Sequence, residues 1–84
     1  MNPLDAVVGS IGAVPRSHIL RVASWLWDSG IKTEIFYEET LKVSEQIKIA
    51  ANKGAKWLVI VGEDEIRNGN IIVRDLLAKQ QKII

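Results

Sequence analysis

Five consecutive apolar residues, Trp57 to Val61 with the sequence WLVIV, limit what this chain can fold into. A strand with one exposed face alternates apolar and polar residues, whereas a strand covered on both faces is apolar throughout. Such a strand needs a layer of structure above it and another below it. We therefore expect Trp57 to Val61 to form the middle of a sheet that helices cover on both faces.

The segments before this run alternate between strand and helix patterns. Leu4 to Val8 is short, apolar and rich in valine, and it predicts a strand that ends at Gly9. From Arg16 to Ser29 apolar residues recur at helical spacing, and Gly30 can end that helix. The residues from Ile31 to Tyr37 alternate with the period of a second strand.

A second helix is expected to begin after Thr40, which can cap its first turn, and Gly54 can end it. The inward stripe of this helix is expected to hold the apolar residues Val43, Ile47, Ala50 and Ala51. The outward stripe is expected to include Lys42, Gln46, Ile49 and Lys53. The helix would therefore present one face to the sheet and the other to water.

A polar stretch follows Val61 and is expected to contain one helical turn from Glu63 to Ile66. The Asn68-Gly69 pair can then reverse the chain into a strand from Asn70 to Arg74. A last short strand is predicted near Lys82 to Ile84. These strands would add an antiparallel edge to the sheet.

The order strand, helix, strand, helix, strand implies parallel strands joined by right-handed crossovers. We therefore predict an α/β fold in which residues 1–84 form one three-layer domain. Its mixed, mainly parallel sheet would have four to five strands and two or three helices. Ligands bind such sheets beyond the carboxyl ends of the parallel strands, which points to the loops after Val8, Tyr37 and Val61.

Composition excludes several classes of protein. A chain of 84 residues is one small domain, and without cysteine it can form neither a disulfide framework nor a thiolate metal site. A net charge of +1 with locally balanced signs is not typical of proteins that bind duplex phosphates without regard to sequence. No apolar run approaches the roughly 20 residues of a membrane span. We expect a cytoplasmic protein with no membrane contact.

Three features could carry catalytic or ligand chemistry. The loop from Gly9 to Gly12 could hold a phosphate on its backbone amides, but it lacks the third glycine or the lysine of nucleotide-binding loops. A plain turn is the preferred interpretation, and a small phosphate-binding enzyme is the weakest functional alternative. His18 has no serine-histidine-acid order around it. Glu63, Asp64 and Glu65 could bind a hard cation or form a solvated loop. We expect no catalytic residue, metal or cofactor.

The three tryptophans divide into two groups. Trp27 and Trp57 are expected in the core. Trp25 falls toward the side of its helix and is expected to be partly exposed, where an indole ring can stack on a base or contact a protein.

Two long segments resemble a known module: VASWLWDSGIKTEIFY and KVSEQIKIAANKGAKWLVIVGEDEIRNGNIIVRDL. In order and content they are similar to the anticodon-binding domain that class II aminoacyl-tRNA synthetases for histidine, glycine, threonine and proline share. The likeness is greatest to the histidyl-tRNA synthetases. It extends from about Leu4 to Ile84, and the ordered set of motifs is more specific than any one of them.

The resemblance implies that the domain receives the splayed anticodon bases of a tRNA. It also implies that Glu65 and Arg74 are among the RNA-binding residues. The chemistry agrees, because a carboxylate accepts hydrogen bonds from base amino and imino groups and a guanidinium donates to base carbonyls or a phosphate. Tyr37, Lys42 and Gln46, at a strand end and a helix start, are expected to give supporting contacts.

The resulting hypothesis is a non-catalytic anticodon recognition domain of a histidine-tRNA ligase, with the tRNA anticodon loop as its partner. The alternative is a stand-alone, synthetase-like regulatory or dimerisation module that binds RNA or protein. A homodimer or a synthetase catalytic domain is a further expected partner. The resemblance also implies that the chain lacks the family's last helix, which would expose an apolar strip holding some of Ile60, Ile72 and Ile83.

Overall fold

A computed structural model describes residues 4–12, 14–36 and 42–84, except for the side chains of residues 64–66. Within these ranges five strands and three helices follow one another along the chain. In order they are β1 (Ala6–Ile11), α1 (Arg16–Asp28), β2 (Thr33–Ile35), α2 (Val43–Asn52), β3 (Trp57–Gly62), α3 (Glu63–Asn68), β4 (Ile72–Asp75) and β5 (Gln80–Ile83).

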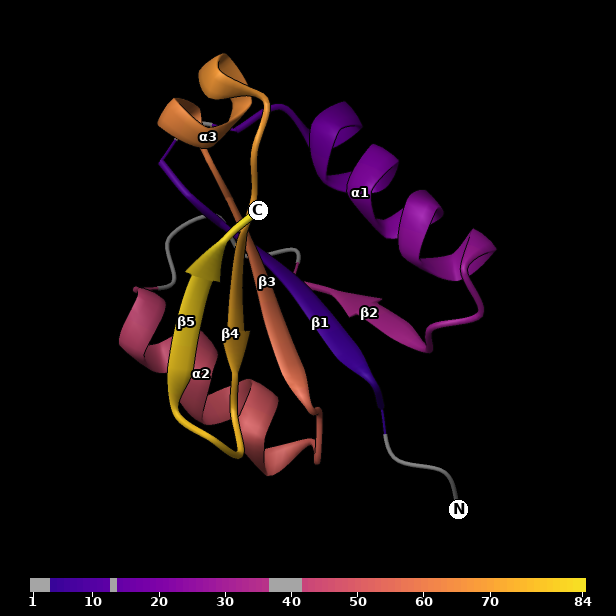
Figure 1. The fold of residues 1–84 in the computed structure, drawn as a ribbon, viewed down its shortest axis with the longest axis vertical. Coiled ribbons are helices and arrows are strands. Elements are labelled where there is room, and N and C mark those ends of the chain that lie inside the picture. Colours follow the sequence, from indigo (N-terminus) through magenta and orange to yellow (C-terminus); the bar gives the residue numbers. More distant parts are fainter. Residues whose placement is uncertain (1–3, 13, 37–41) are drawn as a thin grey trace.

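One mixed sheet has the strand order β2-β1-β3-β4-β5 (Figure 1). β1 runs parallel to both β2 and β3, whereas β4 runs antiparallel to β3 and to β5. The prediction that Trp57 to Val61 forms the central strand is confirmed, because β3 lies between the parallel and the antiparallel parts of the sheet. The α/β class and the last strand are confirmed as well.

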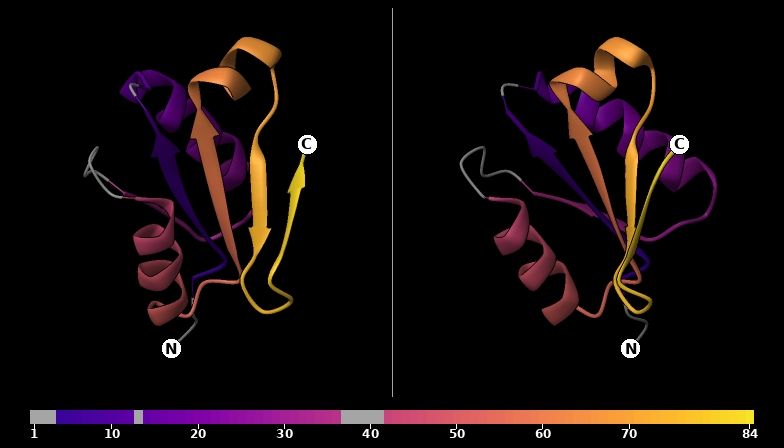
Figure 2. Two further views of the ribbon diagram at one scale, coloured as in Figure 1. Left: turned by 90° about the vertical axis from the view of Figure 1, so that its left-hand side faces the viewer. Right: turned by 60° about the vertical axis from the view of Figure 1, so that its left-hand side comes forward.

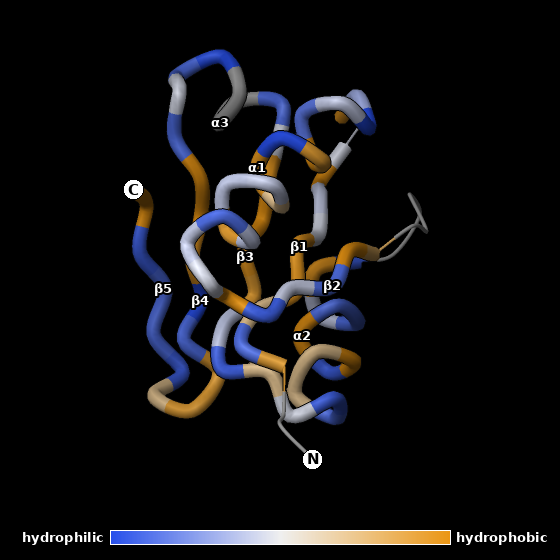
Figure 3. The backbone as a smooth tube through the Cα atoms, turned by 90° about the vertical axis from the view of Figure 1, so that its right-hand side faces the viewer, coloured by the Kyte–Doolittle hydropathy of each residue, from blue (hydrophilic) through white to orange (hydrophobic). Residues whose placement is uncertain are grey.

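α1 and α2 lie on opposite faces of the sheet, so the domain has three layers (Figure 2). Side chains alternate across a strand, and β3 therefore supplies both interiors. The α1 face buries Ala6, Val8, Ile19, Ala23, Leu26, Val59 and Val61. The α2 face buries Val7, Ala50, Ala55, Leu58, Ile60 and Ile72. Figure 3 shows the hydrophobic β1 and β3 in the centre and the mostly hydrophilic β5 at the edge.

The structure agrees with the prediction for α1 and departs in part from the prediction for α2. α1 begins at Arg16 and is followed by Gly30 at a φ of +80°, as expected for a glycine that ends a helix. α2 has Lys42 as its N-cap, and the expected cap Thr40 lies outside the described residues. The expected inward Ala51 is exposed, so the inward stripe of α2 was partly wrong.

The strand predicted to end at Gly9 continues to Ile11, which corrects its boundary. Gly9 is buried and pairs with Ile60 of β3. A glycine inside a strand often marks a place where another group approaches the backbone closely. Gly9 is such a place, because an added Cβ would collide with Oε1 of Gln46. The glycine therefore makes room for a side chain of α2 and does not end the strand.

The exposed apolar surface overlaps the predicted strip at one residue and includes a groove on the other face of the sheet. Ile60 and Ile72 are buried on the α2 face, and only Ile83 of the predicted strip is exposed. On the α1 face, beside β4 and β5, an open groove of about 210 Å³ is lined by Ala6, Trp25, Leu26, Ile31, Trp57, Val59, Ile71, Val73 and Ile84. Period-2 alternation puts apolar residues on both faces of β3 and does not reveal which face a helix leaves open.

The tryptophans bear out part of the prediction. Trp25 is 60% exposed, as expected for a residue at the side of its helix. Trp57 is half-buried against the α1-face cluster. Trp27 was expected in the core but is 47% exposed, and its indole N–H donates to the carbonyl of Thr33 at 3.0 Å. That hydrogen bond gives the ring a role at the surface between α1 and β2.

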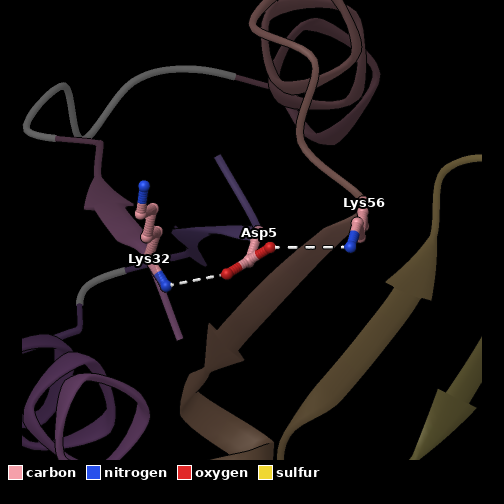
Figure 4. A network of polar contacts seen from close by, with 3 residues as sticks. All are labelled: Asp5, Lys32 and Lys56. Atoms are coloured by element: carbon pink, nitrogen blue, oxygen red, sulfur yellow. Dashed lines mark hydrogen bonds and ion pairs between the residues drawn. The ribbon is translucent and has the colours of Figure 1, made fainter. Parts of the chain in front are cut away.

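Asp5 joins the amino ends of the three parallel strands (Figure 4). Its Oδ2 accepts the backbone N–H of Lys32 at 3.0 Å, and its Oδ1 lies 3.7 Å from Nζ of Lys56. Its backbone carbonyl also accepts the N–H groups of Lys56 and Trp57, both at 3.0 Å.

The helices of the described ranges are too short or too polar for any of them to span a membrane.

Candidate nucleic-acid interface

The carboxyl ends of β1 and β3 lie side by side and form an edge that the rest of the site surrounds. Ile11, the last residue of β1, pairs with Gly62, the last residue of β3. Gly12 follows with a φ of +79°, and a Cβ there would lie 3.1 Å from Oε1 of Glu63. The positive φ and the adjacent carboxylate both favour glycine at this position. α3 rises directly above this edge (Figure 1).

These contacts correct the expectation of a plain turn from Gly9 to Gly12. Gly9 and Ser10 belong to β1, so the glycines do not form a continuous loop. Of Gly9 and Gly12, only Gly12 has the left-handed backbone of a turn. Among the described residues no group of histidine, aspartate and glutamate side chains is arranged to hold a metal ion.

Gln46 was expected on the outward stripe of α2, but it is only 2% exposed. Its Nε2 donates to the carbonyl of Ser10 at 2.9 Å, and its side chain covers Gly9. A polar side chain is tolerated in an interior when its amide is hydrogen-bonded. Gln46 therefore lies beneath the edge as part of its support, out of reach of a ligand on the surface.

Of the other two predicted contact residues, Lys42 lies within the described residues and Tyr37 does not. Lys42 is exposed at the N-cap of α2, and its carbonyl accepts the N–H groups of Glu45 and Gln46 at 3.0 Å. Its side chain is therefore available to a ligand near the start of α2. Tyr37 lies outside the described residues.

Glu65 and Arg74 occupy different heights on the sheet. Glu65 is in the middle of α3, beyond the carboxyl end of β3. Its side chain is not among those that the structure describes. Arg74 pairs with Leu58, four residues before Gly62, and four residues of strand measure about 13 Å. Arg74 is half-buried on the same face as Leu58 and Ile72. Arg74, Gln46 and Lys42 thus share the α2 side of the molecule.

Arg74 has one donor without a partner. Its Nε is buried, and within the described part of the chain no acceptor lies in hydrogen-bond range. Oδ1 of Asn70, which precedes β4, is a buried acceptor with no donor in range among the described residues. An unsatisfied buried polar group costs about 1–3 kcal/mol, so such groups are usually completed by ordered water, by an ion or ligand, or by a small rearrangement.

The sequence placed Gly9 and Ser10 in a candidate loop but did not predict their contacts with Gln46, and it missed Asn70 as part of this region. A signal was present for the first of them, because Gly9 interrupts an apolar, β-branched run and such a glycine can mark a close approach. Ser10 acts through its backbone carbonyl, which any residue carries. Asn70 was expected only as the first residue of a strand.

The chain matches one family model and several histidine–tRNA ligases. A family model described as "Anticodon binding domain" matches residues 6–84. The histidine–tRNA ligase of Stenotrophomonas maltophilia is 40% identical over 80 residues, which are 95% of this chain and 17% of that protein. The cytoplasmic histidine–tRNA ligase of rice, Oryza sativa subsp. japonica, is 36% identical over 61 residues, 73% of this chain and 8% of that protein. The chain thus spans only 8% to 17% of these relatives.

Solved structures share the fold. The apo histidyl-tRNA synthetase of S. aureus superimposes with a TM-score of 0.81 at 26% identity, over 98% of this chain and 21% of that one. The histidyl-tRNA synthetase of Nostoc sp. PCC 7120 superimposes with a TM-score of 0.90 at 23% identity, over 99% of this chain and 20% of that one. Both structures therefore share the fold of this chain.

Proposed function

The chain belongs to the anticodon-binding domain family, and from this premise we propose that it recognises the anticodon loop of a histidine tRNA. The observation that carries the proposal is the match to histidine–tRNA ligases over 95% of the chain, together with the family match over residues 6–84. The domain would be one part of a histidine–tRNA ligase and would not be catalytic by itself. Unpaired loop bases expose the edges that protein side chains can read.

Two residues are proposed to read bases, Glu65 from α3 and Arg74 from β4. A carboxylate accepts from base amino and imino groups, and a guanidinium donates to a base carbonyl or a phosphate. The half-buried Arg74, whose Nε finds no acceptor within the described ranges, supports its part of the proposal. Lys42 is proposed to contact the RNA backbone from the exposed N-cap of α2, and Tyr37 to add a contact nearby.

The test compares an anticodon stem-loop of histidine tRNA with the same hairpin carrying a scrambled loop. Arg74→Ala and Glu65→Gln should each reduce the preference for the first RNA by about 1–3 kcal/mol. Arg21→Ala and Glu34→Gln are matched controls, because they remove the same charges from exposed positions on α1 and β2. Isothermal titration would give the affinities, and NMR shift mapping would locate the surface.

The control variants should bind like the original chain, with changes in shift concentrated near residues 63–74. Equal binding of the two RNAs would rule out base recognition. An effect of Arg21→Ala as large as that of Arg74→Ala would mean that charge alone carries the affinity, as in non-specific binding.

The parent protein is proposed to carry a synthetase catalytic domain, which the length of the relatives supports. The proposed location is the cytoplasm, as in the name of the rice relative, although a human relative is named as mitochondrial. A tagged form of the whole protein would test both, by mass spectrometry and by fluorescence microscopy. Enrichment in mitochondria would overturn the proposed location.

A specific observation favours the second candidate, a dimerisation module. The groove beside β4 and β5 has only apolar lining, and apolar grooves of this kind are often contact surfaces. A second copy of the chain is the proposed occupant. Sedimentation equilibrium over a hundredfold range of concentration should then show a reversible dimer, whereas a monomer throughout would exclude this candidate.

A further inference from the structure

The backbone of β1 extends beyond the strand that it pairs with on one side. Ala6 donates its N–H to Lys32, and Val8 accepts the N–H of Phe36, so these alternate residues direct their polar groups toward β2. Ser10 continues the same alternation, but β2 ends at Ile35. The carbonyl of Ser10 accepts Nε2 of Gln46 at 2.9 Å. A side chain from α2 thus takes over the ladder at the point where β2 stops.

The space around this hydrogen bond leaves little room for movement. Gln46 is 2% exposed, and its amide covers Gly9, where a Cβ would collide with it. The ring of Phe36 closes the same space, 3.3 Å from the position of that Cβ. The amide is therefore held by packing on two sides and by its hydrogen bond to Ser10.

This contact joins two segments that flank the candidate interface. Ser10 is two residues from Gly12, where the chain leaves the sheet beside Glu63. Gln46 is one turn from Lys42, and its backbone N–H donates to the Lys42 carbonyl at 3.0 Å. A shift of the amide would therefore move the start of α2 relative to the end of β1.

We propose that Gln46 is a positioning residue for RNA recognition: it holds the carboxyl end of β1 and the first turn of α2 in the arrangement that binds the anticodon loop. The inference rests on the proposed function and deepens it. Gln46 does not touch the RNA. A site that is aligned before binding loses less free energy on ordering, and the apparent affinity falls in proportion to the aligned fraction.

Two substitutions separate hydrogen bonding from packing. Gln46→Leu fills similar space but cannot donate to Ser10. Gln46→Glu keeps the shape, and the introduced carboxyl can donate only when protonated; burial raises the pKa of such a group. Of its described neighbours, Gly9, Ser10 and Phe36 carry no titratable side chain, and Lys42, one turn earlier on α2, carries an exposed ammonium group. Asn52→Leu is the matched control, because it removes an exposed amide from the far end of α2.

Affinity for the histidine anticodon stem-loop would be measured at about pH 5 and about pH 8, on either side of the expected titration, and divided by the wild-type value at the same pH. Gln46→Leu should bind about tenfold more weakly at both values if the aligned fraction falls to about a tenth. Gln46→Glu should match it at the higher pH and recover toward wild type at the lower pH. Asn52→Leu should bind like wild type. Circular dichroism would verify that each variant is folded.

A second readout needs no RNA and no substitution. In the wild-type chain the side-chain amide protons of Gln46 should exchange with solvent much more slowly than those of Asn52. Fast exchange would overturn the inference, as would wild-type affinity in folded Gln46→Leu or an affinity of Gln46→Glu that does not recover at low pH. If the wild-type chain binds no stem-loop, the proposed function fails, while slow exchange would still support the contact. If Gln46→Leu does not fold, Gln46→Glu and the exchange rates decide.

Discussion

The two faces of the sheet are closed to different degrees although both are apolar. On the α2 face Val7, Leu58 and Ile60 are at most 1% exposed. On the α1 face Trp57 and Val73 are only half-buried, and the groove lies open beside them. The composition of the strands does not explain this, because β3 supplies large apolar residues to both faces.

The difference comes from which strands each helix covers. α2 packs on β1 and β3, at the centre of the sheet. α1 packs on β1 and β2, toward one edge, and on its face the groove lies open beside β4 and β5. Both faces of those outer strands mix apolar and polar residues: the α2 face carries Ile72, Arg74, Gln81 and Ile83, and the α1 face carries Val73, Asp75, Gln80 and Lys82. Closure therefore depends on the lateral position of a helix more than on the hydrophobicity beneath it.

The largest expected effect contrasts a residue of the closed face with one of the groove. Leu58→Ala should lower the free energy of unfolding by about 3 kcal/mol, since it removes a fully buried side chain and leaves a cavity. Ile84→Ala, at a site that is 69% exposed, should cost about 0.5 kcal/mol. Urea unfolding of both variants would measure the two values. Similar costs would mean that the groove is closed in solution.

A smaller effect is expected where the closed face accepts a polar side chain. Gly9→Ala should cost about 2 kcal/mol, because the new methyl group would displace the Gln46 amide from Ser10. In the double variant with Gln46→Ala much of that penalty should disappear, with a coupling of about 1 kcal/mol. A double-mutant cycle by thermal or urea unfolding checks this. Additive costs would show that the crowding at Gly9 comes from another group.

The attachment of α1 to β2 can be tested at Trp27. Trp27→Phe keeps the ring packing but removes the N–H that donates to Thr33, and should cost about 1 kcal/mol. Tryptophan fluorescence of the remaining Trp25 and Trp57 would report whether α1 shifts over the groove, since both line it. An unchanged stability would indicate that packing alone holds α1 beside β2.

The smallest effect is expected outside both faces. Lys53→Ala breaks the ion pair of Lys53 Nζ with Glu34 at 3.1 Å, but both side chains are nearly half-exposed. Exposed pairs contribute roughly 0–1 kcal/mol, so we expect less than about 0.5 kcal/mol, and less again in high salt. Unfolding at low and high ionic strength would test this. A loss larger than that of Trp27→Phe would give this edge a role that its exposure does not suggest.

The order and type of the main elements could be predicted because they depend on local patterns. The helical spacing before Gly30 and the apolar run from Trp57 to Val61 are properties of short segments. The end of β1 and the burial of Gln46 depend on a contact between residues 36 positions apart, and no local pattern contains it. The same holds for Trp27, whose partner Thr33 belongs to the next strand.

For the candidate site, the sequence predicted the position on the sheet better than the contacts of the individual side chains. The carboxyl ends of β1 and β3 do lie at one edge, because strand direction alone decides where they lie, and the loop after Tyr37 is outside the described residues. The roles of Glu65, Arg74, Lys42 and Tyr37 stay predictions. For Gln46, helical spacing alone could not show that a glycine on a distant strand leaves room for its amide.

The junction at Asp5 has a consequence for how fast the domain folds and unfolds. Its bond to Lys32 spans 27 residues, and its contacts with Lys56 and Trp57 span more, so each closes a long loop of chain. Because these contacts join segments far apart in the chain, we expect them to form late in folding. Asp5→Ala should then act mainly by accelerating unfolding, and a chevron plot would show it in the unfolding limb. The contacts at the amino end of the sheet would then limit the rate of unfolding and so set the lifetime of the folded domain.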